Sequence, residues 1–446
     1  MFDWDKRGLF FENIGKAGIK TGNFRDLVKK SAQKLENLRA HQADDAFFIG
    51  LLDLPMAAQV RIMAQSIPFE VKTLIVLGIG GSYAGAAAAI RAIRPQGLKT
   101  PAVDVRFLPT ADPETVVPIL RDIDPATTLV NCVSKSGRTV EIMALYALFR
   151  ERFHTALGRD WTRHFVFTTD PKQGALRTVA MEIGIKTMDV PPGLGGRFSV
   201  LSPVGLFPML MAGIDIDAVV IGAQDYMRQE YPQAVQSAAI HSLLMDSGIA
   251  IRTLMTYNDS MEAFGLWFAQ LYAESLGKKR GDTCVGQTPL LFQGSRDQHS
   301  LLQLFMDGPK DKVYTVLKFS THRLDTKVPN GVLQDPAVSD LNGKHLSEVF
   351  DAEARATTAA LVHAGKPVEI ITVPVPDAHE IGALFAHFEL ETAIMGLIMG
   401  VNPFDQPGVE IGKVYAHAIL GRQDLHDTAK TLQDVENMID IDEVKL

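Results

Sequence analysis

Cysteine is scarce in this chain of 446 residues, which carries only Cys132 and Cys284. Two thiols so far apart in sequence exclude a disulfide framework and favour a reducing, cytoplasmic environment. An excess of positive charge is also lacking, because 44 Lys and Arg stand against 52 Asp and Glu, a net charge of −8. The sequence therefore disfavours nucleic acid as a partner, and an anionic ligand would need donors gathered at one site.

Long apolar runs are missing as well. The N-terminal segment is charged throughout and lacks the continuous apolar stretch of a secretory signal. The most apolar segment, residues 383–401, is interrupted by His387, Glu389 and Glu391, so its apolar part is too short to cross a bilayer. We expect no membrane contact, a buried helix at this segment, and structural roles for both glutamates.

The composition that remains is that of an ordinary globular protein, with 46% hydrophobic and 22% charged residues. From residue 72 onward, short apolar runs alternate with segments of helical character, which predicts parallel sheets with helices on both faces. The predicted strands are 73–77, 103–108, 127–133, 165–168 and 186–190 in a first α/β unit, and 250–256, 313–319 and 368–373 in a second. Residues 277–308 are expected to be rich in loops.

This alternation also predicts a division of the chain. We expect a helical N-terminal arm at 1–70, a first α/β domain at 71–215, a second at 216–400, and a helical C-terminal arm at 401–446. The last arm is expected to hold one helix of about a dozen residues.

A glycine-rich turn, Gly78-Ile-Gly-Gly-Ser82, follows the first predicted strand and opens a helix. Free backbone N–H groups at such a position favour an anion. The dinucleotide fingerprint is incomplete, because Tyr83 stands at its third glycine position, and no Walker A lysine follows. A tight structural turn explains the motif equally well.

A second loop, Ser134-Lys-Ser-Gly-Arg-Thr139, also lies between a predicted strand and a helix. It offers three hydroxyls, backbone N–H groups and two cations, which suit a phosphate group. A helix cap would need only one hydroxyl. The pattern therefore favours phosphate binding over simple capping.

Six motifs occur in order between Leu77 and Lys413: GIGGSYAGA, SKSGRTVE, GGRFSVLSPVGL, QLYAESLGKK, DQHSLLQLFMDG and NPFDQPGVEIGK. The first two resemble a sugar isomerase (SIS) domain, and together the six resemble the bacterial type of the glucose-6-phosphate isomerase family. The resemblance implies two SIS-type, flavodoxin-like α/β/α sandwich domains with mainly parallel sheets, plus helical arms at both ends. Arg138 departs from the pattern, which has Thr at that position.

The resemblance also implies an activity and a site. The activity is an aldose–ketose isomerisation of glucose 6-phosphate and fructose 6-phosphate through ring opening and a cis-enediolate, without cofactor or metal. From the sequence alone Glu274 would be a surface residue near a helix end, but the resemblance makes it the base that moves the proton between C1 and C2. Arg197 stabilises the enediolate, and His299 and Lys413 open the sugar ring. The residues implied in substrate binding are Gly81, Ser82, Ser134, Lys135, Ser136, Thr139 and Gln406.

Family members of this kind act as homodimers with composite sites, in which the residue matching His299 reaches the neighbouring subunit's site. Two alternatives remain open on the sequence. One is a bifunctional isomerase that also accepts mannose 6-phosphate. The other is a non-catalytic SIS protein that senses sugar phosphates, for which a basic DNA-binding helix pair is expected and is not evident here.

Overall fold

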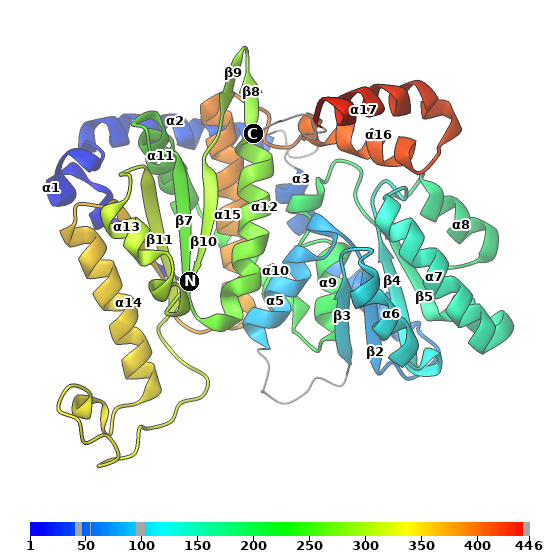
Figure 1. Ribbon diagram of the computed structural model, residues 1–446, viewed down its shortest axis with the longest axis horizontal. Helices are drawn as coiled ribbons and strands as arrows, with labels where there is room; N and C mark the ends of the chain where they lie inside the picture. The colour runs from blue at the N-terminus through cyan, green and yellow to red at the C-terminus, as the bar shows by residue number, and fades with distance from the viewer. Residues whose placement is uncertain (41–46, 54, 95–102, 440–446) are drawn as a thin grey trace. The chain divides into compact units, whose positions relative to one another are not determined.

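The computed structural model describes residues 1–40, 47–53, 55–94 and 103–439 (Figure 1). The chain divides into two compact units, Met1–Pro403 and Phe404–Leu446.

The first sheet has five parallel strands in the order β3-β2-β4-β5-β6. The strands are β2 (Thr73–Leu77), β3 (Asp104–Leu108), β4 (Thr128–Val133), β5 (Phe165–Thr169) and β6 (Lys186–Asp189). This is the flavodoxin-like order 2-1-3-4-5. β3 is added on one side of β2 and β4 on the other, so the strand order reverses between β2 and β4. The loops that follow these two strands, 78–82 and 134–139, therefore lie side by side at the edge where such sheets bind ligands.

The second sheet repeats this plan in the order β1-β12-β11-β7-β10. The parallel strands are β7 (Ile251–Tyr257), β10 (Thr288–Gln293), β11 (Lys312–Phe319) and β12 (Val368–Val373), and the antiparallel strand is β1 (Asp3–Asp5). All eight strands predicted from the sequence are present within one residue of their expected ends. The predicted fold class, two flavodoxin-like α/β units with mainly parallel sheets, is confirmed.

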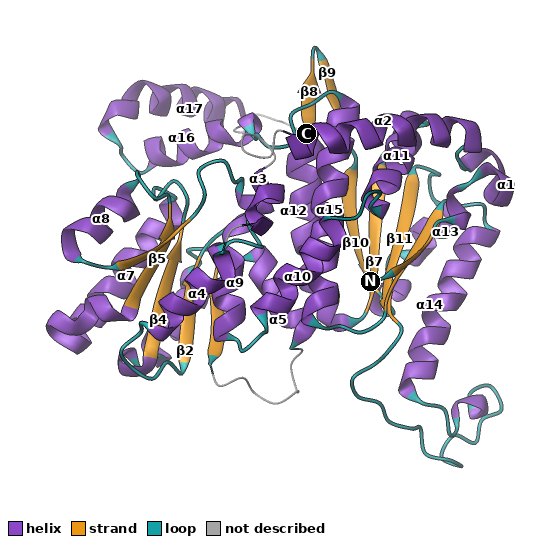
Figure 2. Ribbon diagram, turned by 180° about the vertical axis from the view of Figure 1, so that it is seen from behind, coloured by secondary structure: helices purple, strands orange, loops and turns teal. Residues whose placement is uncertain are grey.

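Helices cover both sheets (Figures 1 and 2). In the first half of the chain they are α1 (Phe11–Ile14), α2 (Thr21–Ala40), α3 (Phe47–Gly50), α4 (Met56–Gln65), α5 (Ala84–Ile93), α6 (Pro113–Asp122), α7 (Val140–Leu157), α8 (Ala175–Ile183), α9 (Pro203–Met211) and α10 (Ile216–Met227). In the second half they are α11 (Gln233–Asp246), α12 (Glu262–Leu276), α13 (Leu302–Asp307), α14 (Leu346–His363) and α15 (Ala378–Met399). The unit Phe404–Leu446 holds α16 (Glu410–Ile419) and α17 (His426–Ile439).

The apolar helix α15 is a core element. Its length and composition would suit a membrane span, so the expectation that its apolar part is too short for one was wrong, but 89% of its most apolar stretch is buried inside the protein. It packs against α10, α11 and α12. The expected buried helix is confirmed.

Three local predictions were wrong. The N-terminal segment contains a strand as well as helices, because Trp4 turns inward from β1 and its Nε1 donates to Glu369 Oε2 at 2.9 Å. The stretch 277–308 holds a hairpin of β8 (Lys278–Arg280) and β9 (Thr283–Val285) and the strand β10. Pro289 obscured β10, but an edge strand tolerates proline. The C-terminal arm has two helices, α16 and α17, instead of one.

A buried ionic cluster joins the second sheet to α15. Arg252 Nη1 on β7 lies 2.6 Å from Glu391 Oε1, and its Nη2 lies 3.5 Å from Glu369 Oε1 on β12. All three side chains are fully buried. The positive Arg252 lowers the pKa of Glu391 against the effect of burial. Glu389, on the same helix, is also fully buried, and burial raises the pKa of its carboxyl well above the ordinary value.

We expect Arg252→Met to lower the free energy of unfolding by about 3–5 kcal/mol, because two buried carboxylates would lose their shared counter-charge. Urea unfolding at neutral pH measures the change. Arg163→Met is the matched control, since Arg163 and Asp160 form an exposed pair 3.4 Å apart and its loss should cost less than about 1 kcal/mol. Equal losses in the two variants would contradict a structural role for the cluster.

Candidate active site

The centre of the site is an ion pair between Glu274 and Arg197. Glu274 lies in the last turn of α12, and Arg197 lies in the short helical turn Gly196–Phe198. Arg197 Nη1 donates to Glu274 Oε1 at 3.1 Å. The Arg197 side chain is 1% exposed, whereas that of Glu274 is 26% exposed. A ligand can therefore reach the carboxylate while the guanidinium stays fixed behind it.

Three further contacts fix the Arg197 guanidinium. Its Nε donates to Ser275 Oγ at 2.7 Å, and its Nη2 donates to the Pro403 carbonyl at 2.5 Å. The guanidinium carbon lies 5.6 Å from the ring centre of Phe198. Because the cation is held from several sides, its charge is preorganised beside Glu274.

Gln270 is a site residue that the sequence analysis missed. Its Nε2 donates to Glu274 Oε2 at 3.1 Å, so both carboxylate oxygens are held. It also lies against the first glycine-rich loop, where a Cβ built on Gly80 would be 2.9 Å from Gln270 Nε2. The available signal was its spacing, because residues four apart on a helix share one face.

The first loop packs directly on the turn that carries Arg197. A Cβ built on Gly81 would lie 2.1 Å from the Gly196 carbonyl oxygen. Only glycine allows this close approach of the two backbones. Ser82, the next residue, is half-buried. The tight-turn interpretation is therefore satisfied, and substrate binding by Gly81 and Ser82 stays a prediction.

The hydroxyl groups of the second loop, residues 134–139, form hydrogen bonds with other groups of the same loop. Ser134 Oγ lies 2.8 Å from Thr139 Oγ1 and accepts from the Gly137 N–H at 3.1 Å. The exposed Ser136 accepts from the Arg138 N–H at 3.2 Å. Thr139 is the N-cap of α7, yet among the described residues its hydroxyl caps none of the first N–H groups of that helix. Helix capping thus does not explain the three hydroxyls.

Lys135 joins this loop to the segment that leads to Arg197. Its Nζ donates to the carbonyls of Pro192 and Leu194, the latter at 2.9 Å. Burial lowers the pKa of the Lys135 ammonium group. Through Lys135 and Gly81, both loops of the first sheet meet the segment 192–197, which in turn holds Glu274.

His299 is not brought to Glu274 within one chain. It is exposed in the turn Arg296–His299, which follows β10. Arg296 Nη1 pairs with Glu262 Oε1 at 3.2 Å, at the first residue of α12. Glu274 lies near the other end of that helix, about 18 Å further along its axis.

The other two predicted residues belong to the unit Phe404–Leu446. Lys413 lies on α16, and its Nζ donates to Glu410 Oε1 at 2.7 Å. Gln406 precedes the short turn Pro407–Val409. Their roles at the substrate stay predictions.

Across the described ranges, no group of three or more His, Cys, Asp or Glu side chains could hold a metal ion.

Two doubly wound sheets, glycine-rich and hydroxyl-rich loops at a switch point, and a carboxylate beside a buried guanidinium together define an isomerase of the sugar-phosphate class. Residues 65–437 match the family described as "Phosphoglucose isomerase". The chain belongs to the phosphoglucose isomerase family, and its activity is the interconversion of glucose 6-phosphate and fructose 6-phosphate.

Individual relatives agree with this assignment. The glucose-6-phosphate isomerase of Carboxydothermus hydrogenoformans is 35% identical, over 97% of each chain. A solved structure of a hypothetical protein from Thermus thermophilus is 35% identical, with a TM-score of 0.84 over 94% of this chain and 100% of that one. A glucose-6-phosphate isomerase from Chlamydia trachomatis shares the fold at 24% identity, with a TM-score of 0.70 over 86% of this chain and 76% of the other.

Proposed function

We propose that this isomerase carries its proton on Glu274 and stabilises its intermediate with Arg197. The contact of 3.1 Å between Arg197 Nη1 and Glu274 Oε1 is the observation that supports this assignment. The reaction then runs through ring opening, removal of the C2 proton by Glu274, a cis-enediolate, and return of the proton to C1.

A single carboxylate suits both transfers, because C1 and C2 are adjacent and the proton leaves and returns on the same face of the enediolate. When Glu274 takes the proton it becomes neutral, and the negative charge moves to the enediolate oxygens. Arg197 cannot give up a proton at neutral pH, so it offsets that charge without entering the proton transfer. Gln270 is a positioning residue that holds the second carboxylate oxygen.

The phosphate of the substrate is assigned to the loop 134–139. This loop lies at the switch point of the first sheet and precedes the N-terminus of the 18-residue helix α7. Backbone N–H groups at the start of a helix favour an anion. The exposed hydroxyl of Ser136 is placed to donate to a phosphate oxygen.

Ser136→Ala is expected to weaken substrate binding by about 1–3 kcal/mol, seen as a raised KM with kcat little changed, because phosphate contacts persist from ground state to transition state. Steady-state kinetics with fructose 6-phosphate measure it. Ser339→Ala, at another serine that is exposed, is the control. An unchanged KM in Ser136→Ala would refute the phosphate assignment.

Arg138→Thr is expected to stay active, and a collapse of its activity would show that this enzyme depends on Arg138.

Ring opening is assigned to His299 and Lys413, whose side chains suit proton transfer at a ring oxygen and an anomeric hydroxyl. His299 lies in the turn whose Arg296 pairs with Glu262, at the opposite end of α12 from Glu274. A His299 that acts on the same sugar must then come from a second copy of the chain. We therefore infer a homodimer with two composite sites.

The two reduced cysteines favour the cytoplasm as the place where this isomerase acts.

A coupled assay with glucose 6-phosphate, fructose 6-phosphate and mannose 6-phosphate tests the substrate range. Full activity is expected after exhaustive chelation, and a strict metal requirement would overturn the scheme above. Family membership sets aside the non-catalytic sensor, and turnover of mannose 6-phosphate would show the bifunctional alternative.

A further inference from the structure

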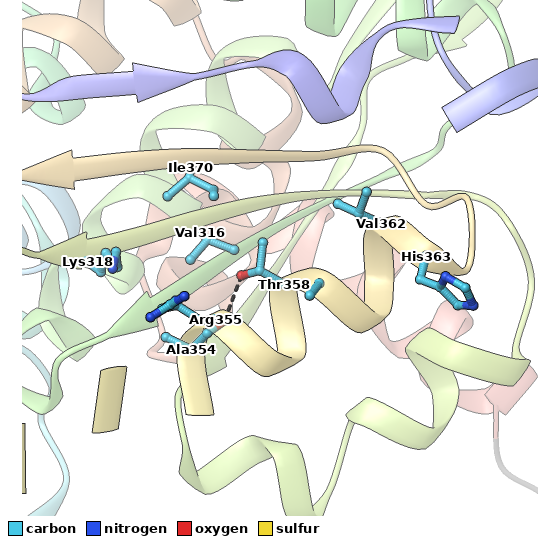
Figure 3. A pocket seen from close by; sticks show the side chains of 9 residues that line it. Val316, Lys318, Ala354, Arg355, Thr358, Val362, His363 and Ile370 are labelled. Carbon is cyan, nitrogen blue, oxygen red and sulfur yellow. Dashed lines mark hydrogen bonds between the residues drawn. The ribbon is translucent and has the colours of Figure 1, made fainter. Parts of the chain in front are cut away.

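A groove of about 490 Å³ runs between α14 and the strands β11 and β12 (Figure 3). Val316 and Ile370 form its floor on the sheet side. Thr358, Ala359 and Val362 form its wall on the helix side. The volume lies within the range of small-molecule binding sites.

On the helix-side wall of this groove, the one polar side-chain group has a hydrogen-bond partner within the helix. Thr358 Oγ1 donates to the Ala354 carbonyl at 2.7 Å, so this hydroxyl needs no hydrogen bond from a ligand. Val316 and Ala354 belong to the buried core cluster, whereas Val362 and Ile370 pack against that cluster and are only partly buried. The groove is therefore an opening of the hydrophobic core toward water.

The charged residues that line the groove are all basic. Figure 3 places Lys318 and Arg355 together at one end and His363 at the other, and no carboxylate is among the lining residues. In the part of the chain that the structure describes, neither Lys318 nor Arg355 forms an ion pair. An apolar trough with two unpaired cations at one end is complementary to a molecule with an apolar body and an anionic head.

We propose that this groove binds an amphipathic anion, namely a medium-chain carboxylate whose chain lies on Val362 and Ile370. Its carboxylate would accept hydrogen bonds from Lys318 and Arg355, and a guanidinium can bind a carboxylate with two N–H groups. The chain would replace water along the apolar floor and so gain from the hydrophobic effect.

This groove lies away from Glu274. In both overall views the strands of the second sheet stand between α14 and α12, the helix that carries Glu274 (Figures 1 and 2). A ligand in the groove would therefore not contact Glu274. Binding is therefore open to test on the active enzyme.

Isothermal titration of the full-length protein with octanoate at constant ionic strength tests the proposal. Saturable binding is expected, with an affinity at least tenfold above that of octan-1-ol. The double variant Lys318→Gln/Arg355→Gln should bind octanoate at least tenfold more weakly and octan-1-ol unchanged. Ala359→Phe fills the groove from an exposed helix position, and it should abolish binding of both. Arg159→Gln, at an exposed arginine elsewhere, should bind as the wild type.

Isomerase activity at saturating fructose 6-phosphate should be unchanged in every variant, which shows that each one folds. Absence of saturable binding would overturn the proposal. Binding that survives Ala359→Phe would place octanoate elsewhere and also overturn it. Binding that occurs only after dilution into monomers would assign the groove to a subunit contact, with the same consequence. Equal affinity for octanoate and octan-1-ol would refute the role of the two cations.

Discussion

Glu274→Gln is expected to lower kcat by about 10²–10⁴-fold, while sugar phosphate still binds. Glutamine keeps the shape of the side chain and its place beside Arg197 and Gln270, but it cannot accept a proton from C2. Solvent deuterium should therefore stop entering C1 and C2. The coupled assay gives kcat, and proton NMR of the sugar in heavy water follows the exchange.

Glu389→Gln is the matched control for this variant. Glu389 is a fully buried carboxyl whose pKa is raised by burial, so the change to a neutral amide should leave activity near the wild-type level. If Glu274→Gln exchanged deuterium near the wild-type rate and Glu389→Gln did not, the base would be Glu389.

Activity is also expected to return when two inactive chains are combined. Glu274→Gln and His299→Ala should each be nearly inactive alone. After they are mixed, unfolded and refolded together, about half of the dimers are heterodimers, and each of these holds one intact site of two. The recovered activity should therefore approach roughly a quarter of the wild-type value.

The control for this experiment is each variant refolded alone, and native mass spectrometry shows that heterodimers have formed. Failure to recover activity with heterodimers present would place His299 in its own chain's site or outside the site. A histidine with only a structural role gives no reason for one inactive chain to rescue another.

The sheets were predictable because apolar residues dominate their central strands. β2 and β4 are buried on both faces, and all of their buried residues except Thr128 and Asn131 are hydrophobic. β1 and β10 were not predicted because both lie at sheet edges, where a short strand or a strand with a proline is tolerated. The second C-terminal helix, α17, was within reach of the sequence, because Leu432, Val435 and Ile439 recur at helical spacing.

The site was predictable only in part, and mainly through whole motifs. Arg197 and Glu274 are 77 residues apart, so their contact depends on tertiary packing that no local pattern encodes. The same holds for Lys135, whose carbonyl partners lie more than 50 residues away. Gln270 was within reach of a local argument, because it is one helical turn before Glu274.

Helix α12 has a consequence for how two sites in a dimer would communicate. One end of this helix carries Glu274, and Glu262 at the other end lies 3.2 Å from Arg296, in the same turn as His299. In the proposed dimer with composite sites, one helix would supply the base of its own site and would lie beside the turn that carries the ring-opening histidine of its neighbour. A movement of α12 on substrate binding would then displace groups of both sites, which would couple the two sites.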